Sequence, residues 1–101
     1  MYKATKEQIA EWKEKYGGVF KIKVEDESGD KVCYLKKPSR KVLGMATVAG
    51  KDNPIKFNET VIRECWLGGD EDIKTDDTLF LSASGKIPEI IETRQAELEK
   101  L

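Results

Sequence analysis

The side chains that most often carry out enzyme chemistry are sparse in this sequence. Histidine is absent from all 101 residues, which removes the commonest general base at neutral pH and the commonest metal ligand. The two cysteines, Cys33 and Cys65, form no C-x-x-C pair, and without histidine neither has the usual partner of a cysteine nucleophile. We therefore expect two buried, reduced thiols and no catalytic residue.

A cluster of carboxylates between residues 70 and 77 is the nearest approach to a metal site. Asp70, Glu71 and Asp72 are consecutive, and Asp76 and Asp77 follow shortly after them. Calcium and magnesium prefer oxygen ligands, but this cluster lacks the ordered spacing and the distal glutamate of an EF-hand loop. A solvated loop followed by helix-capping carboxylates is the favoured interpretation, and weak binding of magnesium or calcium is the alternative. We expect no bound metal and no cofactor.

Basic residues gather between residues 36 and 41, in the sequence KKPSRK. A basic stretch can contact the phosphates of a nucleic acid, yet this one is short and Tyr34 is its only aromatic neighbour. We expect an exposed joint between two elements, with contact to a protein or to a nucleic acid as the alternatives.

Charge is distributed unevenly along a chain whose net charge is −1. Residues 1–51 carry a net charge of +5 and residues 52–101 a net charge of −6. The simplest interpretation of this asymmetry is that both halves present solvated charged surfaces. The alternative is a dipolar molecule whose basic end binds an acidic end on a partner or on a second copy of itself. The sequence has no apolar run near the ~20 residues that span a bilayer, nor the apolar core of a signal peptide. These features predict a cytoplasmic protein.

The spacing of apolar residues predicts one α+β domain over residues 1–101. A helix is expected over residues 5–16, because Thr5 and Gln8 fit a capping box and Gly17 follows its last turn. A β-hairpin follows, with strands at residues 19–25 and 31–36 that alternate apolar with charged residues around a Ser28-Gly29 turn.

The remainder of the chain has the periodicity of about four short helices. The first covers residues 39–49, and the second begins at Asn53-Pro54 and continues to a stop at Gly68-Gly69. Thr75 is expected to cap a third helix over residues 76–84. The last helix is expected over residues 88–101, with Arg94 near its apolar stripe. This stripe could pack on its own domain or lie in a partner's groove.

Large apolar residues on these helices are the candidates for contact with another protein. Trp12 and Trp66 both lie on apolar stripes, where core packing is the ordinary explanation, but an aromatic residue near a helix end can also anchor an interface. Trp66 is the better candidate because it precedes the Gly-Gly stop. The predicted partner-binding residues are Trp66, Phe57, Ile62, Ile91 and Leu98.

Four segments give the chain a resemblance to a known family. They are residues 16–20 (YGGVF), 36–41 (KKPSRK), 64–70 (ECWLGGD) and 80–86 (FLSASGK), the last followed by an acidic stretch. With them the chain resembles the small tail assembly chaperones of tailed bacteriophages and prophages, over nearly its whole length. The resemblance implies a protein that coats the tape measure protein before tail assembly, keeps it soluble and recruits tail tube subunits. It implies no catalytic residue.

Two other functions remain open on the sequence. One is a small regulatory or inhibitory protein of a mobile element that binds a host protein or a nucleic acid. The other is a magnesium-dependent enzyme that uses the acidic cluster.

Overall fold

The computed structural model describes residues 2–91 and 95–101 of the chain. It is the predicted α+β fold, with an N-terminal helix, a β-hairpin and several short helices, to which one further strand is added. The elements in chain order are α1 (Lys6–Tyr16), β1 (Val19–Val24), β2 (Lys31–Lys36), α2 (Arg40–Ala49), α3 (Pro54–Cys65), β3 (Trp66–Gly69), α4 (Asp72–Thr75), α5 (Asp77–Ser84) and α6 (Ile87–Ile90).

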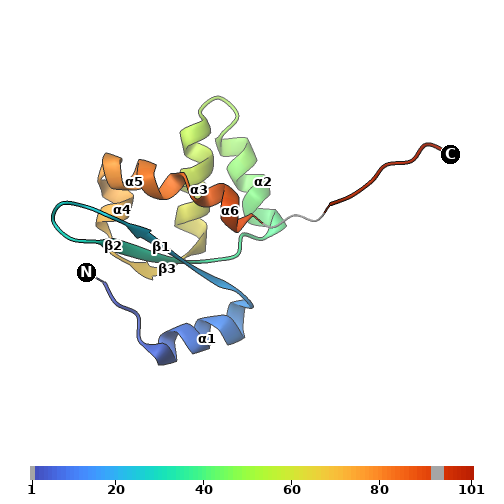
Figure 1. Ribbon diagram of the computed structural model, residues 1–101. Coiled ribbons are helices and arrows are strands. Elements are labelled where there is room, and N and C mark those ends of the chain that lie inside the picture. The colour runs from blue at the N-terminus through green and yellow to red at the C-terminus, as the bar shows by residue number, and fades with distance from the viewer. Residues whose placement is uncertain (1, 92–94) are drawn as a thin grey trace.

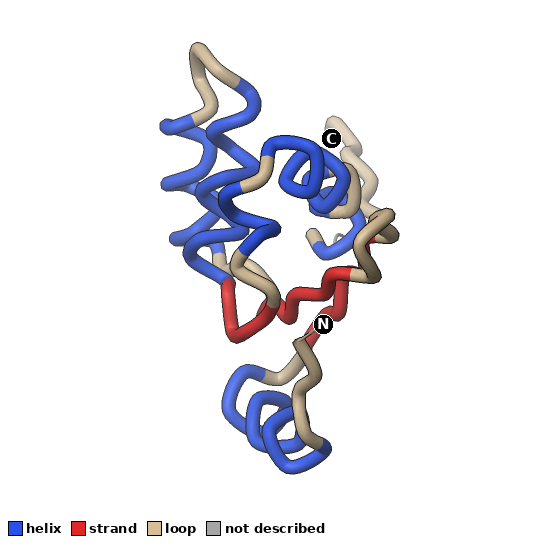
Figure 2. The backbone as a smooth tube through the Cα atoms, turned by 90° about the vertical axis from the view of Figure 1, so that its left-hand side faces the viewer, coloured by secondary structure: helices blue, strands red, loops and turns tan. Residues whose placement is uncertain are grey.

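The strands form one antiparallel sheet in the order β1-β2-β3, which lies between two helical layers (Figures 1 and 2). α1 lies on one side of the sheet, and the cluster of helices from α2 to α6 lies on the other. In the hairpin Ile22 is paired with Cys33 and Lys21 with Tyr34. Because side chains alternate along a strand, this register turns the first pair toward the helical cluster and the second toward α1.

The ends of several helices follow the local signals of the sequence. The Thr5 N–H donates to Gln8 Oε1 at 2.9 Å and the Gln8 N–H donates to Thr5 Oγ1 at 3.1 Å, which completes the predicted capping box. α1 ends where Gly17 takes a φ of +85°, a conformation that costs glycine little. Asn53 caps α3 by accepting from the Ile55 N–H at 3.2 Å, and Pro54 occupies its first turn.

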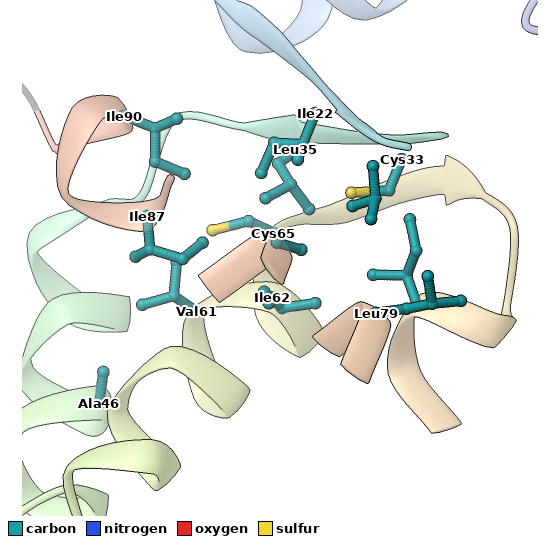
Figure 3. Packing of buried hydrophobic residues seen from close by; sticks show 13 residues of the cluster. Ile22, Cys33, Leu35, Ala46, Val61, Ile62, Cys65, Leu79, Ile87 and Ile90 are labelled. Carbon is teal, nitrogen blue, oxygen red and sulfur yellow. The ribbon is translucent and has the colours of Figure 1, made fainter. Parts of the chain in front are cut away.

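The hydrophobic core lies between the sheet and the helical cluster (Figure 3). Cys33 and Leu35 of β2 point down onto α3, which contributes Val61, Ile62 and Cys65. The other buried apolar members are Ile22, Val24, Ala46, Ile73, Leu79, Ala83, Ile87 and Ile90. Since α4, α5 and α6 each contribute residues to this cluster, short helices with little stability of their own are held by shared burial.

The opposite face of the sheet carries a smaller aromatic contact. Tyr34 lies with its ring 5.6 Å from that of Trp12 and 6.1 Å from that of Tyr2, measured between ring centroids. No residue of α1 is buried, so Trp12 packs here at the surface and outside the main core. The core packing expected as the ordinary position for Trp12 is therefore wrong.

The prediction that α3 continues to Gly68-Gly69 is wrong, because the helix ends at Cys65 and Trp66–Gly69 forms β3. The glycines allow this strand to lie close to its neighbours. A Cβ at Gly69 would lie 2.6 Å from the Cα of Cys33, and one at Gly68 would lie 2.7 Å from Tyr2 Oη. Gly69 thus permits a close backbone approach to β2, where the sequence suggested a helix stop.

Three further predictions about the second half of the chain need correction. Part of the expected acidic loop forms the short helix α4. Asp76, not Thr75, caps α5, since its Oδ1 accepts from the Leu79 N–H at 3.0 Å. α6 has only four residues, and residues 95–101 are in neither helix nor strand, so the long helix expected over residues 88–101 is wrong; Arg94 lies outside the described residues.

Candidate partner-binding groove

An antiparallel pair of helices forms the floor of the candidate site. α2 begins at Ser39, whose Oγ accepts from the Val42 N–H at 3.2 Å, and it ends at Gly50. A Cβ at Gly50 would lie 2.8 Å from the Cβ of Phe57. Glycine therefore lets the end of α2 approach the first turns of α3 closely and places the Phe57 ring beside the joint between the two helices.

α6 forms the remaining wall. Pro88 is exposed and Ile91 is half-buried beside the buried Ile87. Together with α2 and α3 these residues surround an open groove of about 540 Å³. Its described lining residues are Thr47, Gly50, Lys51, Pro54, Phe57, Asn58, Ile87, Pro88 and Ile91.

The groove is predominantly apolar. Of the described residues that line it, Lys51 alone carries a charge, while Phe57 and Ile91 both retain partial exposure and pack against the core. An exposed apolar hollow with few polar groups is the usual feature of a surface that binds a partner's apolar side chains. The arrangement can therefore bind the apolar face of another chain.

Comparison of the chain with protein-family models, with curated proteins and with solved structures finds no match. The groove and the surrounding surface therefore carry the functional argument.

The five predicted partner-binding residues lie in four places. Phe57 and Ile91 meet in the groove. Ile62 is only 2% exposed and is among the residues that line a different cleft. Leu98 is 99% exposed in the C-terminal segment. Trp66 lies on β3, half-buried against the core, with Lys74 Nζ 4.2 Å from its ring centroid.

Sequence patterns placed Ile87 on the apolar stripe of the last helix but did not point to Thr47 or Pro88 as groove residues. These residues come from α6 and α2, which meet only through tertiary packing. Gly50 follows the predicted helix over residues 39–49, but its close approach to Phe57 depends on the helix pairing.

A second cleft, of about 310 Å³, lies beside α3 and α5. Ile55, Ile62 and Phe80 supply its apolar surface. Charged residues of both signs surround them, and these are Glu59, Arg63, Lys74 and Asp77. This cleft is more polar in character than the groove and would suit a partner that presents charged groups of both signs.

The acidic cluster has structural partners within the chain. Asp70 accepts through Oδ1 from the Tyr2 N–H and through Oδ2 from the Val32 N–H, both at 2.9 Å. Asp72 lies 3.3 Å from Lys31 and Glu71 lies 3.1 Å from Lys74, measured between carboxylate oxygen and Nζ. Within residues 2–91 and 95–101, no three carboxylate or cysteine side chains come close enough together to hold a metal ion.

The basic stretch connects β2 to α2. Lys36 Nζ lies 5.0 Å from the centroid of the Tyr16 ring, Pro38 is buried and Ser39 caps α2. Arg40 and Lys41 are exposed at the start of that helix. The stretch is thus a joint between two elements, with cation–π and capping contacts of its own.

The cysteines are both free and buried. Burial raises the pKa of the Cys33 thiol to about 12, and the Asp70 carboxylate contributes to this rise. Burial also raises the pKa of Cys65, against the opposing effect of Lys36. Because the thiolate is the nucleophilic form, these thiols are poorly suited to covalent catalysis at neutral pH.

None of the helices in the described part of the chain has the length and apolarity needed to cross a membrane.

Proposed function

We propose that this protein is a phage tail assembly chaperone that binds the tape measure protein and recruits tail tube subunits in the cytoplasm of a bacterial host. The observation that supports the proposal most directly is the apolar groove between α2, α3 and α6. A tape measure protein offers long apolar helical surface, as the family resemblance implies, and an amphipathic helix binds by placing its apolar face in such a groove.

The action is binding and not catalysis. The chain has no histidine, and its two thiols are held in the protonated form by burial. Phe57 and Ile91 are the groove residues expected to contact the apolar side chains of the tape measure helix, because both are partly exposed there. Lys51 at the same groove favours a carboxylate on the helix that binds.

Co-expression with the tape measure protein encoded in the same gene cluster, followed by affinity capture and size-exclusion chromatography, tests the proposal. We expect a stable complex and an increase in the soluble fraction of the tape measure protein. Ile91→Asp places a charge in the groove and should abolish capture. Ile55→Asp is the matched control, because Ile55 is 49% exposed in the second cleft and should leave capture unchanged.

Two results would contradict this function. One is the absence of any complex when both proteins are folded and soluble. The other is equal loss of capture in both variants, which would place the contact outside the groove. A tail tube protein added to the complex should enter it, and its exclusion would remove the recruitment step alone.

A second candidate is a small regulatory or inhibitory protein of a mobile element that binds a host protein. The cleft beside α3 and α5 favours it, since Arg63 and Lys74 lie there together with Glu59 and Asp77 and could pair with charges on a folded partner. The gene neighbourhood separates the two functions. Tail tube and tape measure genes on either side support the chaperone, and their absence supports the regulator.

A further inference from the structure

β1 is an edge strand with a free outer side. Within the described part of the chain it pairs with β2 alone, so its outward N–H and C=O groups can accept another strand. Its side chains alternate: Ile22 and Val24 are buried toward the helical cluster, whereas Lys21 and Lys23 are exposed on the other face. A groove of about 360 Å³ follows this edge, lined by residues 20–23 together with Lys86, Glu89 and Ile90.

The C-terminal segment, residues 95–101, has the complementary pattern. Its sequence is QAELEKL, it has no helix or strand, and its leucines Leu98 and Leu101 are 99% and 106% exposed. It extends away from the folded part of the molecule (Figure 1). The run Glu97-Leu98-Glu99 matches the run Lys21-Ile22-Lys23 with opposite charges on either side of an apolar residue.

We propose that the C-terminal segment of one copy adds as an antiparallel strand to the free edge of β1 in a second copy. With Leu98 opposite Ile22, Glu97 lies opposite Lys23 and Glu99 opposite Lys21. Opposite charges directly across two strands are mutually stabilising, and the added backbone hydrogen bonds satisfy the open edge. Leu98 then faces the groove that Ile22 and Ile90 line.

The charged groups of β1 are available for these pairs. Lys23 Nζ lies 3.8 Å from Asp30 Oδ2, and both side chains are largely exposed, so this contact is weak and exchangeable. Lys86 pairs with Glu89 at 3.2 Å and so adds little net charge to the groove. Lys21 and Lys23 therefore give the edge its positive character.

A second copy is the occupant because the segment points away from its own β1 and because each copy supplies both a β1 edge and a segment of opposite charge. Such an interface joins unlike surfaces, the segment of one copy and the edge of another. Copies can therefore join by reciprocal exchange of their segments into a closed pair, or head to tail into longer assemblies, and both raise the average mass with concentration. The proposal does not depend on the tape measure protein, since only this chain takes part.

Sedimentation velocity of the full chain over a range of protein concentrations tests the assembly. We expect the average mass to rise with concentration at low salt and to fall as salt is added. Lys21→Glu/Lys23→Glu and, separately, Glu97→Lys/Glu99→Lys should each lower the association constant by at least tenfold. Lys6→Glu/Lys56→Glu changes the net charge equally at two exposed positions and should have less than a twofold effect.

Restoration of charge complementarity gives the decisive result. A mixture of the two double variants, and the quadruple variant that carries all four changes, should regain association, because each edge again faces a segment of opposite charge. Failure of both to regain it would overturn the proposal. So would a wild-type chain that stays monomeric at every concentration, which would leave the segment free or bound to its own copy.

A peptide of residues 95–101 locates the contact. Added to the full chain that carries Glu97→Lys/Glu99→Lys, whose own segment no longer matches the edge, it should shift the backbone amide NMR signals of residues 20–24 in a saturable manner. A peptide in which Glu97 and Leu98 are exchanged keeps the composition but breaks the alternation, and it should bind at least tenfold more weakly. Shifts centred on Phe57 and Ile91, or equal binding of both peptides, would refute the β1 site.

Discussion

Replacing Asp70 with alanine removes a carboxylate that joins three parts of the chain. Its two oxygens accept from the Tyr2 and Val32 N–H groups, each at 2.9 Å, and its own N–H donates to the Val32 carbonyl at 2.8 Å. The side-chain contacts are lost in the variant, whereas the backbone contact can remain. The N-terminal segment would then lose its hydrogen bond to Asp70, and the end of β3 would keep only the backbone hydrogen bond to β2.

The cost can be estimated from these two bonds. A hydrogen bond to a charged acceptor contributes about 1.5–3 kcal/mol, and partial exposure of Asp70 favours the lower end of that range. We therefore expect Asp70→Ala to lower the free energy of unfolding by about 2–4 kcal/mol, with a fall in Tm of roughly 10–20 °C. In a chain that begins at residue 3 the effect should be about half as large, because the Tyr2 donor is absent.

Urea unfolding followed by circular dichroism measures this change, and Asp72→Asn provides the control two residues away. The Asp72 side chain is 60% exposed in its ion pair with Lys31, so its loss should cost less than about 1 kcal/mol. If Asp70→Ala were no more destabilising than Asp72→Asn, the structural role assigned to Asp70 would be refuted.

Three further changes test other parts of the fold. Gly69→Ala should lower the free energy of unfolding, measured in urea, by more than about 2 kcal/mol. The reason is that the added Cβ would lie 2.6 Å from the Cα of Cys33. An unchanged urea midpoint would mean that β3 can move aside. Gly44→Ala should raise the free energy of unfolding by about 0.5–1 kcal/mol, because alanine favours a helix over glycine. Gly44 lies in α2, and nothing lies within 4 Å of the position that the added methyl group would occupy. A loss of stability would contradict the helical conformation of residue 44. The pKa of Cys33 rises from 9.0 to about 12 on folding. As pH rises above about 9, the thiol therefore ionises in the unfolded chain while it stays protonated in the folded one. The free energy of unfolding should then fall between about pH 9 and pH 12, by up to about 1.4 kcal/mol per pH unit. Cys33→Ala should lack that part of the slope in unfolding measured against pH, and equal slopes in the two proteins would contradict the burial of the thiol.

Local sequence signals predicted the first half of the fold well. The capping box of Thr5 and Gln8, the alternation along residues 19–24 and the helix start at Asn53-Pro54 all form as expected. Each depends on residues within a few positions of one another, and the physical cause acts within one turn or one strand. Such signals can be evaluated without knowledge of the tertiary structure.

Long-range contact decided the features that the sequence left ambiguous. Gly68-Gly69 has the composition of a helix stop, but both residues pair with β2, and the backbone of β2 lies so close to Gly69 that a side chain there would be prevented. Likewise, the apolar residues of the C-terminal segment have helical spacing, yet Leu98 has no neighbouring surface in this structure to pack against. Periodicity alone stabilises a short helix little without such a surface.

The candidate groove likewise combines properties that each residue has by itself with an arrangement that depends on tertiary packing. The sequence marked Phe57 and Ile91 as apolar residues suited to a partner, because that property belongs to each residue separately. Only the tertiary structure brought them together, with α6 folded against the pair α2 and α3, and placed Ile62 in the core. The sequence thus determined the types of side chain and the local elements, whereas the exposure and grouping of those side chains depended on packing between segments distant in the chain.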